Sequence, residues 1–190
     1  RTLIVNNDLL NKNVLSGAIK QARKKALEYI MEQEDVYSEC GFLSPEFNII
    51  RATLSKNGII ANDTVKNVEY RIRQDALNVF DDGVVSGEPV MEAICNKLLE
   101  AESGRMPMSD LYKLLKGEPF GLRDGYIPVL IAYALKNYQN VSIYFHGNEH
   151  SYSVDELIKA LEEPENYTLF ICNWNEEETE YIEALEKLFG

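Results

Sequence analysis

The sequence predicts a mainly α-helical protein with a small β element, which is the α+β fold class. Apolar residues recur at helical spacing in much of the chain, for example over 15–30. Segment 124–138 is apolar on nearly every side, a pattern typical of a buried helix. Segments 140–145 and 167–172 are rich in β-branched and aromatic residues, which favour strands. These observations together predict helices packed around a few short strands.

The first 80 residues are predicted to be almost entirely helical. A strand-like segment at 2–5 precedes a long helix that begins near residue 9 or 13 and ends at 33. A second helix occupies most of 44–58, where an initial Ser-Pro pair supplies the cap and the first helical residue. A final Asn-Gly pair ends it. A third helix is predicted over 65–80 from its apolar stripe.

The second half opens with three predicted helices, over 89–101, 108–115 and 124–138. The last is the most informative, because its apolar residues leave no polar stripe before Lys136. Asp124 is expected to be its N-cap, since a carboxylate can accept from the free amides of the first turn. A helix without a polar stripe needs neighbours on most faces. We therefore expect this helix to be enclosed rather than to line an active site.

Strands and helices alternate in the rest of the chain. Segment 140–145 is a predicted strand, and the His- and Gly-containing turn after it predicts a hairpin. Ser153 and Glu156 have capping-box spacing, which opens a short helix. A strand at 167–172 and a helix from 175 onward complete the predicted elements.

Charge is distributed unevenly and suggests two modules. Residues 1–80 carry 11 Lys and Arg against 10 Asp and Glu, a net charge of +1. Residues 81–190 carry 8 against 21, a net charge of −13. Turn-forming residues are concentrated over 81–89, between two helical patterns. We therefore expect a helical linker region over 1–83 and a second domain over 84–190.

Composition favours a cytoplasmic globular protein. No apolar run approaches the roughly 20 residues that a membrane-spanning helix needs, so no membrane partner is expected. The 3 cysteines lack C-x-x-C spacing, which indicates reduced thiols. The 2 histidines lie in one turn without further close ligands, so we expect no metal and no cofactor. Because the chain begins with arginine rather than methionine, we interpret it as an excised piece of a longer polypeptide.

Three helices followed by a hairpin-like pair of strands resemble a winged helix-turn-helix. Two segments extend the resemblance: L-S-P-E-F-N-I-I-R-A-T-L-S-K-N-G at 43–58 and P-F-G-L-R-D-G-Y-I-P-V-L-I-A at 119–132. Both are similar to segments C-terminal to the nucleotide-binding core of large bacterial P-loop ATPases, including BREX-like phage-defence proteins. The two motifs cover about a sixth of the chain. The resemblance implies a helical linker and a winged-helix-like element that regulate or couple an ATPase.

The chain itself is not expected to be an enzyme. No G-x-x-x-x-G-K-[ST] loop occurs in it, and ATP hydrolysis of this class needs that loop to hold the phosphates. The leading hypothesis is therefore a non-catalytic regulatory or protein-interaction module of a larger bacterial cytoplasmic ATPase. Its partner would be the rest of the parent chain or another protein. A small hydrolase or transferase stays open, because a catalytic site can be assembled from residues that no spacing reveals.

Basic residues support an alternative, a nucleic-acid-binding winged-helix module. Binding to phosphates requires several Lys or Arg side chains on one face. The candidates are Lys20, Arg23, Lys24, Lys25, Arg51 and Lys56. For the first four, a solvated helix face is the favoured interpretation. The net charge of −13 over residues 81–190 opposes duplex binding by that half.

Overall fold

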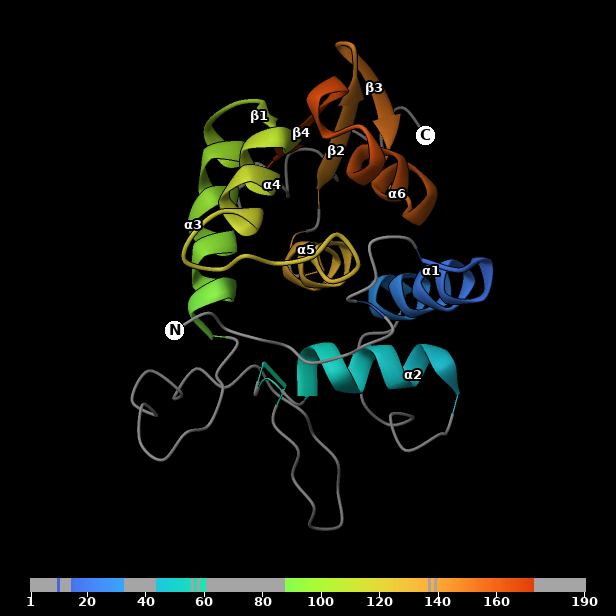
Figure 1. Cartoon of the computed structure of the whole chain (residues 1–190). Coiled ribbons are helices and arrows are strands. Elements are labelled where there is room, and N and C mark those ends of the chain that lie inside the picture. Colours follow the sequence, from blue (N-terminus) through green and yellow to red (C-terminus); the bar gives the residue numbers. More distant parts are fainter. Residues whose placement is uncertain are drawn as a thin grey trace, which may run out of the picture.

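The described part of the chain combines helices with a single four-stranded antiparallel sheet, which lies above the central helix α5 (Ile127–Leu135) in Figure 1. The computed structural model describes residues 10, 15–32, 44–55, 57, 59–60, 88–136, 138 and 140–172. The predicted α+β class is confirmed at this level. None of the helices in the described ranges is both long and apolar enough to cross a membrane.

The helices and strands follow one another in an alternating order. The first are α1 (Gly17–Glu32), α2 (Pro45–Ile50), the π-helical η1 (Arg51–Ser55), α3 (Glu88–Ser103), β1 (Met106–Pro107) and α4 (Met108–Lys116). They are followed by α5 (Ile127–Leu135), β2 (Val141–Phe145), β3 (Asn148–Ser151), α6 (Val154–Glu162), the 3-10 helix η3 (Pro164–Asn166) and β4 (Tyr167–Ile171). The predicted strand at 2–5 and the predicted helices at 65–80 and from 175 onward lie outside the described residues.

The sheet has the strand order β1-β4-β2-β3, and each neighbouring pair is antiparallel. β2 and β3 form the predicted hairpin, in which Phe145 pairs with Asn148. The two residues between them, His146 and Gly147, have φ values of 47° and 85°. Among the two-residue hairpin turns that match the strand twist, type I′ requires positive φ at both positions. Local turn chemistry therefore sets the register of this hairpin.

β4 joins distant parts of the chain into the sheet. It follows α6 in sequence but lies between β1 and β2, where Leu169 pairs with both Met106 and Ile143. β1 was not predicted, because it is two residues long and contains Pro107. Proline cannot donate to a strand ladder and is confined to positions such as edge strands. Its pairing with β4 is what makes it a strand.

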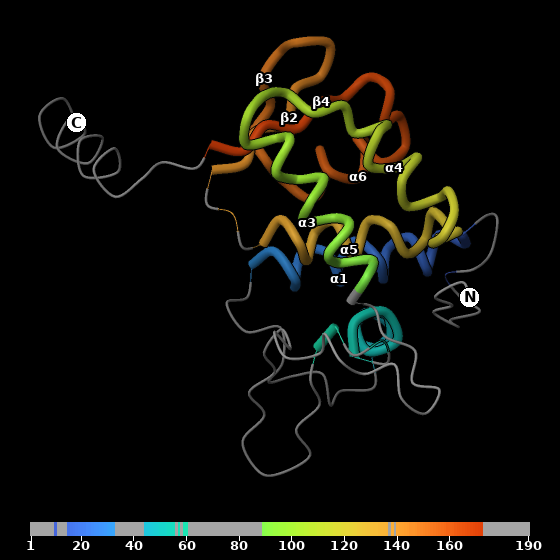
Figure 2. Tube along the Cα trace, turned by 90° about the vertical axis from the view of Figure 1, so that its left-hand side faces the viewer, coloured from blue at the N-terminus to red at the C-terminus, as the bar shows by residue number. Residues whose placement is uncertain are grey.

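Helix α5 lies at the centre of the fold, as predicted. All nine of its residues are buried, and α1, α3, α6 and η1 contact it. Figures 1 and 2 show α1 running beside α5, with α2 below them and the sheet with α4 and α6 above. Burial of a large apolar side chain contributes about 1.5–3 kcal/mol. The near-complete apolar composition of this helix is explained by neighbours on every side.

One hydrophobic core extends through both predicted modules. The cluster includes Leu27 of α1, Ile50 of α2, Ile131 of α5 and Leu169 of β4. Helices from the first 60 residues therefore pack directly on elements of the second half. The predicted boundary between residues 83 and 84 falls outside the described residues, so the division into two domains stays a prediction.

The predicted cap of α5 is wrong. The carboxylate of Asp124 accepts from Lys116 Nζ at 2.8 Å, and α5 has no side-chain cap. The amide of Tyr126 instead bonds to the carbonyl of Arg123 at 2.9 Å, so a turn precedes the helix. Lys116 belongs to α4, so its ion pair with Asp124 is a contact between two elements. A capping rule that considers only neighbouring residues does not predict such a contact.

Ser153 is the N-cap of α6, as predicted, and its hydroxyl accepts from the amide of Glu156 at 3.3 Å. We expect Ser153→Ala to lower the free energy of unfolding by about 0.5–2 kcal/mol, because an amide of the first turn loses its acceptor. Urea denaturation followed by circular dichroism measures this loss. Ser153→Asp keeps an acceptor and is expected to retain most of the stability. Equal losses in both variants would contradict the capping role.

Candidate functional site

The basic residues of α1 do not form one solvated face. Lys20 and Lys25 are exposed, whereas Lys24 is half-buried and Arg23 is only 8% exposed. The helix contacts both α5 and α6, so its inward surface carries charge as well as apolar residues. We take this inward surface of α1, with the pocket beside it, as the candidate functional site.

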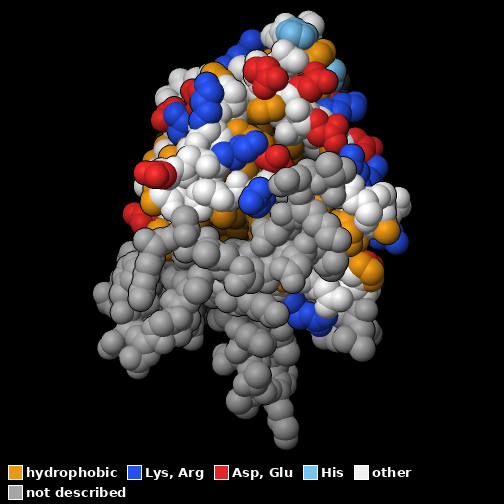
Figure 3. All heavy atoms as spheres, in the orientation of Figure 1, with side chains coloured by type: hydrophobic (Ala, Val, Ile, Leu, Met, Phe, Trp, Pro, Cys, Tyr) orange, Lys and Arg blue, Asp and Glu red, His pale blue; other side chains and the backbone are white. Residues whose placement is uncertain are grey.

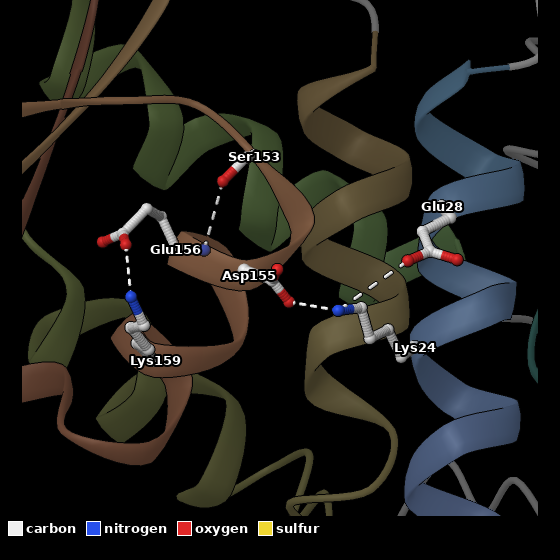
Figure 4. Close-up of polar contacts among 6 residues, drawn as sticks. All are labelled: Lys24, Glu28, Ser153, Asp155, Glu156 and Lys159. Carbon is white, nitrogen blue, oxygen red and sulfur yellow. Dashed lines mark hydrogen bonds and ion pairs between the residues drawn. The ribbon is translucent and has the colours of Figure 1, made fainter.

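Lys24 connects α1 to α6 (Figure 4). Its Nζ lies 2.5 Å from Asp155 Oδ1 and 4.0 Å from Glu28 Oε1. Asp155 belongs to the first turn of α6, where a negative charge is also favourable against the helix dipole. The hydrogen bond to Asp155 raises the pKa of the Lys24 ammonium. This lysine is therefore engaged within the fold rather than free to contact a phosphate.

We expect Lys24→Gln to destabilise the protein modestly, with a smaller effect at high salt because the pair is exposed to solvent. The pKa of Lys24 is higher in the folded than in the unfolded chain. Its contribution is therefore full below the unfolded lysine pKa, about 10.4, and is lost as the pH rises through the folded value. Urea titrations at neutral and strongly alkaline pH measure the difference between variant and wild type. A difference that does not shrink at alkaline pH would contradict the pair.

Arg23 faces a pocket of about 470 Å³ between α1, α4, α6 and the turn before α5. We call it the Arg23 pocket, and its charged lining residues are Lys20, Arg23, Lys116, Asp124, Glu162 and Glu165. Arg23 Nη1 donates to the carbonyl of Asp124 over 3.4 Å, a long hydrogen bond. Its Nε is buried and has no hydrogen-bond partner in the part of the chain that the structure describes. Burial lowers the pKa of the guanidinium, but an arginine stays charged at neutral pH.

Charges in the Arg23 pocket are mixed. Lys116 pairs with Asp124 at 2.8 Å, and its Nζ also lies 5.9 Å from the ring centre of Tyr112. Burial raises the pKa of the Tyr112 hydroxyl, which stays protonated at neutral pH. Figure 3 shows acidic and basic side chains interspersed over the described part of the face viewed there, rather than one continuous basic area. The site thus contains a buried arginine with few hydrogen bonds to the described residues, and the acidic and basic residues around it are about equal in number.

A second pocket of about 540 Å³ lies near the C-terminal ends of α1 and α5. Its lining includes Glu28, Tyr138, Tyr152 and Asp155. The hydroxyl of Tyr152 is buried and has no hydrogen-bond partner among the described residues, and burial raises its pKa. The carboxylates of Asp155 and Glu28 both form ion pairs with Lys24 of α1. Two of the acidic groups that line this pocket are therefore already paired with a cation.

Arg51, one of the two remaining candidates, does not line the Arg23 pocket. Arg51 lies in η1 and donates from Nη2 to Asn48 Oδ1. Lys56 is outside the described residues. The structure therefore does not bring the five described candidates together on one surface. Lys20 and Arg23 share the Arg23 pocket, and Lys24 is turned toward α6.

The other residues of the Arg23 pocket were not predicted from the sequence. Asp124 is 101 residues from Arg23 along the chain, and no spacing rule connects them. One signal was present: Arg23 falls between Ile19 and Ala26 on the apolar stripe of α1. A charged residue on an apolar stripe indicates a buried or interfacial charge.

Sequence and structure comparisons contribute no relative. Protein-family models, curated proteins and solved structures were compared with the chain, and none matched. The resemblance of segments 43–58 and 119–132 to regions beside bacterial ATPase cores stays a prediction. The geometry of the described side chains is the basis of the functional proposal.

Proposed function

We propose that this chain is a non-catalytic protein-interaction or regulatory module of a larger bacterial cytoplasmic ATPase, and that residues 88–172 form a winged-helix-like unit. The order of elements supports the second part. Three helices, α3, α4 and α5, precede a hairpin of β2 and β3, and β1 and β4 complete the same sheet. Helix α6 is then an insertion between the hairpin and the last strand.

The observation that carries the proposal is the burial of α5. In a DNA-binding helix-turn-helix, the recognition helix lies in the major groove and its side chains contact base edges. In the proposed unit α5, the third helix, takes that place. All nine of its residues are buried, and α1 packs against it. A helix covered by protein in this way favours a role in protein contact over reading of DNA.

The basic residues of α1 also favour protein contact over nucleic-acid binding. Lys24 is paired with Asp155, and Arg23 is buried beside Asp124. Of the four basic residues of α1, only Lys20 and Lys25 are exposed. Affinity for nucleic acid comes mainly from several phosphate contacts. Two exposed lysines on α1 supply few of them.

An ATPase assay tests the proposal directly. The purified chain is added to the separately purified ATPase core of the parent protein, and binding and hydrolysis are both measured. We expect saturable binding and a change in hydrolysis rate. If the chain neither binds the core nor changes hydrolysis, the proposal is wrong.

A salt titration tests the nucleic-acid alternative. Fluorescence anisotropy of a labelled duplex is measured from roughly 50 to 200 mM salt, where genuine phosphate contacts weaken steeply. We expect no saturable binding at the lowest salt. Saturable binding with a steep salt slope, reduced by about one in Lys20→Gln and again in Lys25→Gln, would favour the alternative.

A further inference from the structure

We infer that the Arg23 pocket is a binding site for a carboxylate group. The inference concerns a ligand of the chain itself and does not depend on the association with an ATPase. Two independent features point to it: a buried guanidinium whose Nε has no acceptor among the described residues, and a pocket that Arg23 lines and that is large enough for a small ligand.

The first feature is the poor hydrogen bonding of Arg23. A guanidinium has five N–H donors in a fixed fork. Among the described residues, Arg23 makes one hydrogen bond, the 3.4 Å contact from Nη1 to the Asp124 carbonyl. Its Nε is fully buried and has no acceptor in the same part of the chain. Buried polar groups in proteins nearly always have a partner, so an acceptor is expected here.

The second feature is the pocket itself. Its volume of about 470 Å³ falls in the range of about 300–1,000 Å³ found for small-molecule sites. Lys20, three residues before Arg23 on the same helix, lines the same pocket. Residues three apart are neighbours on a helix surface, so a ligand bound to Arg23 lies within reach of both cations.

The chemistry of arginine selects a planar oxyanion. Two parallel N–H groups of a guanidinium match the two oxygens of a carboxylate in a bidentate pair. Arg23 lines the pocket, and its Nε has no acceptor within the described ranges. Phosphate is also a ligand of arginine, so the charge of the pocket decides between the two.

The charge balance favours a monoanion. Lys116 and Asp124 neutralise each other, which leaves Lys20 and Arg23 against Glu162 and Glu165. A phosphate dianion would be repelled more strongly by the two glutamates than a carboxylate. Glu162 lies close enough to favour the charged form of Arg23 and so to raise its pKa against the effect of burial, yet no ion pair joins the two among the described residues. Glu162 is therefore the internal competitor of the ligand.

Nitrogen-15 NMR of the Arg23 guanidinium tests the inference. The Nε–H signal of Arg23, assigned by its loss in Arg23→Lys, is followed by nitrogen-15 NMR at constant ionic strength. The probes are acetate, an N-acetylated diglycine with a free carboxylate, its C-terminal amide, inorganic phosphate and chloride. We expect a saturable shift with acetate or with the free diglycine, and none with the amide or chloride. A response to acetate indicates a small acid, whereas a response to diglycine alone indicates a peptide terminus.

Two matched variants separate binding from structure. Glu162→Gln removes the competing charge and is expected to tighten binding of the responding carboxylate by about tenfold. Lys25→Gln changes an exposed cation of α1 outside the pocket lining and is expected to leave binding unchanged.

Four results would overturn the inference. They are the absence of any saturable shift, an equal response to chloride or the amide, a stronger response to phosphate than to carboxylate, and no tightening in Glu162→Gln.

Discussion

Leu130→Ala is expected to lower the free energy of unfolding by about 2–5 kcal/mol, the usual cost of removing a buried leucine side chain. Leu130, in the middle of α5, is 1% exposed. The loss combines the transfer free energy of the deleted carbon atoms with the cost of the cavity left between α5 and its neighbours. Urea denaturation, monitored by circular dichroism at one pH and ionic strength, measures it.

Leu99→Ala is the matched control. Leu99 lies in α3, also a helix, but is 55% exposed. The same atoms are removed in both variants, and the same change in helix propensity applies, so the difference between them reports burial. We expect Leu99→Ala to change stability by no more than about 0.5 kcal/mol. Similar effects of the two substitutions would mean that α5 is not enclosed.

Gly125→Ala is expected to destabilise the protein by about 1–3 kcal/mol, the typical cost of overpacking. A Cβ at this position would lie 2.4 Å from the carbonyl oxygen of Leu10 and 3.1 Å from its carbonyl carbon. Leu10 is completely buried, and the atoms in the way belong to backbone rather than to a flexible side chain. The backbone of Leu10 would have to move away from the turn before α5. Thermal or urea unfolding of the variant measures the effect.

Gly104→Ala is the control for Gly125→Ala. No heavy atom lies within 4 Å of a Cβ built at Gly104. The control is expected to be neutral or slightly stabilising, since alanine restricts the unfolded chain more than glycine does. If Gly125→Ala were equally neutral, the contact between Leu10 and the turn before α5 would be wrong.

Features that depend on neighbouring residues were predictable from the sequence. The helical periodicity of α1, the apolar composition of α5 and the turn between β2 and β3 each follow from a short stretch of chain. The cap at Ser153 is also local, because its acceptor and donor are three residues apart.

Features that depend on distant residues were not predictable. β1 forms only through its pairing with β4, some 60 residues later in the chain. Asp124 is a residue type that commonly caps helices, but its carboxylate forms an ion pair with Lys116 of α4 instead. Arg23 belongs to a run of basic residues that is typical of a solvated helix face, yet its side chain is buried in the fold. In each case a tertiary contact outweighs the local preference.

Hydrogen exchange of the α5 amides tests the enclosure of this helix most directly. An enclosed central helix exchanges only when the whole protein unfolds, so its opening free energy should equal that of global unfolding and fall with denaturant at the same slope. We expect this behaviour for the amides from Leu130 to Leu135. Exchange at a much lower free energy and without denaturant dependence would show local opening of α5, and would contradict its place as the covered centre of the fold.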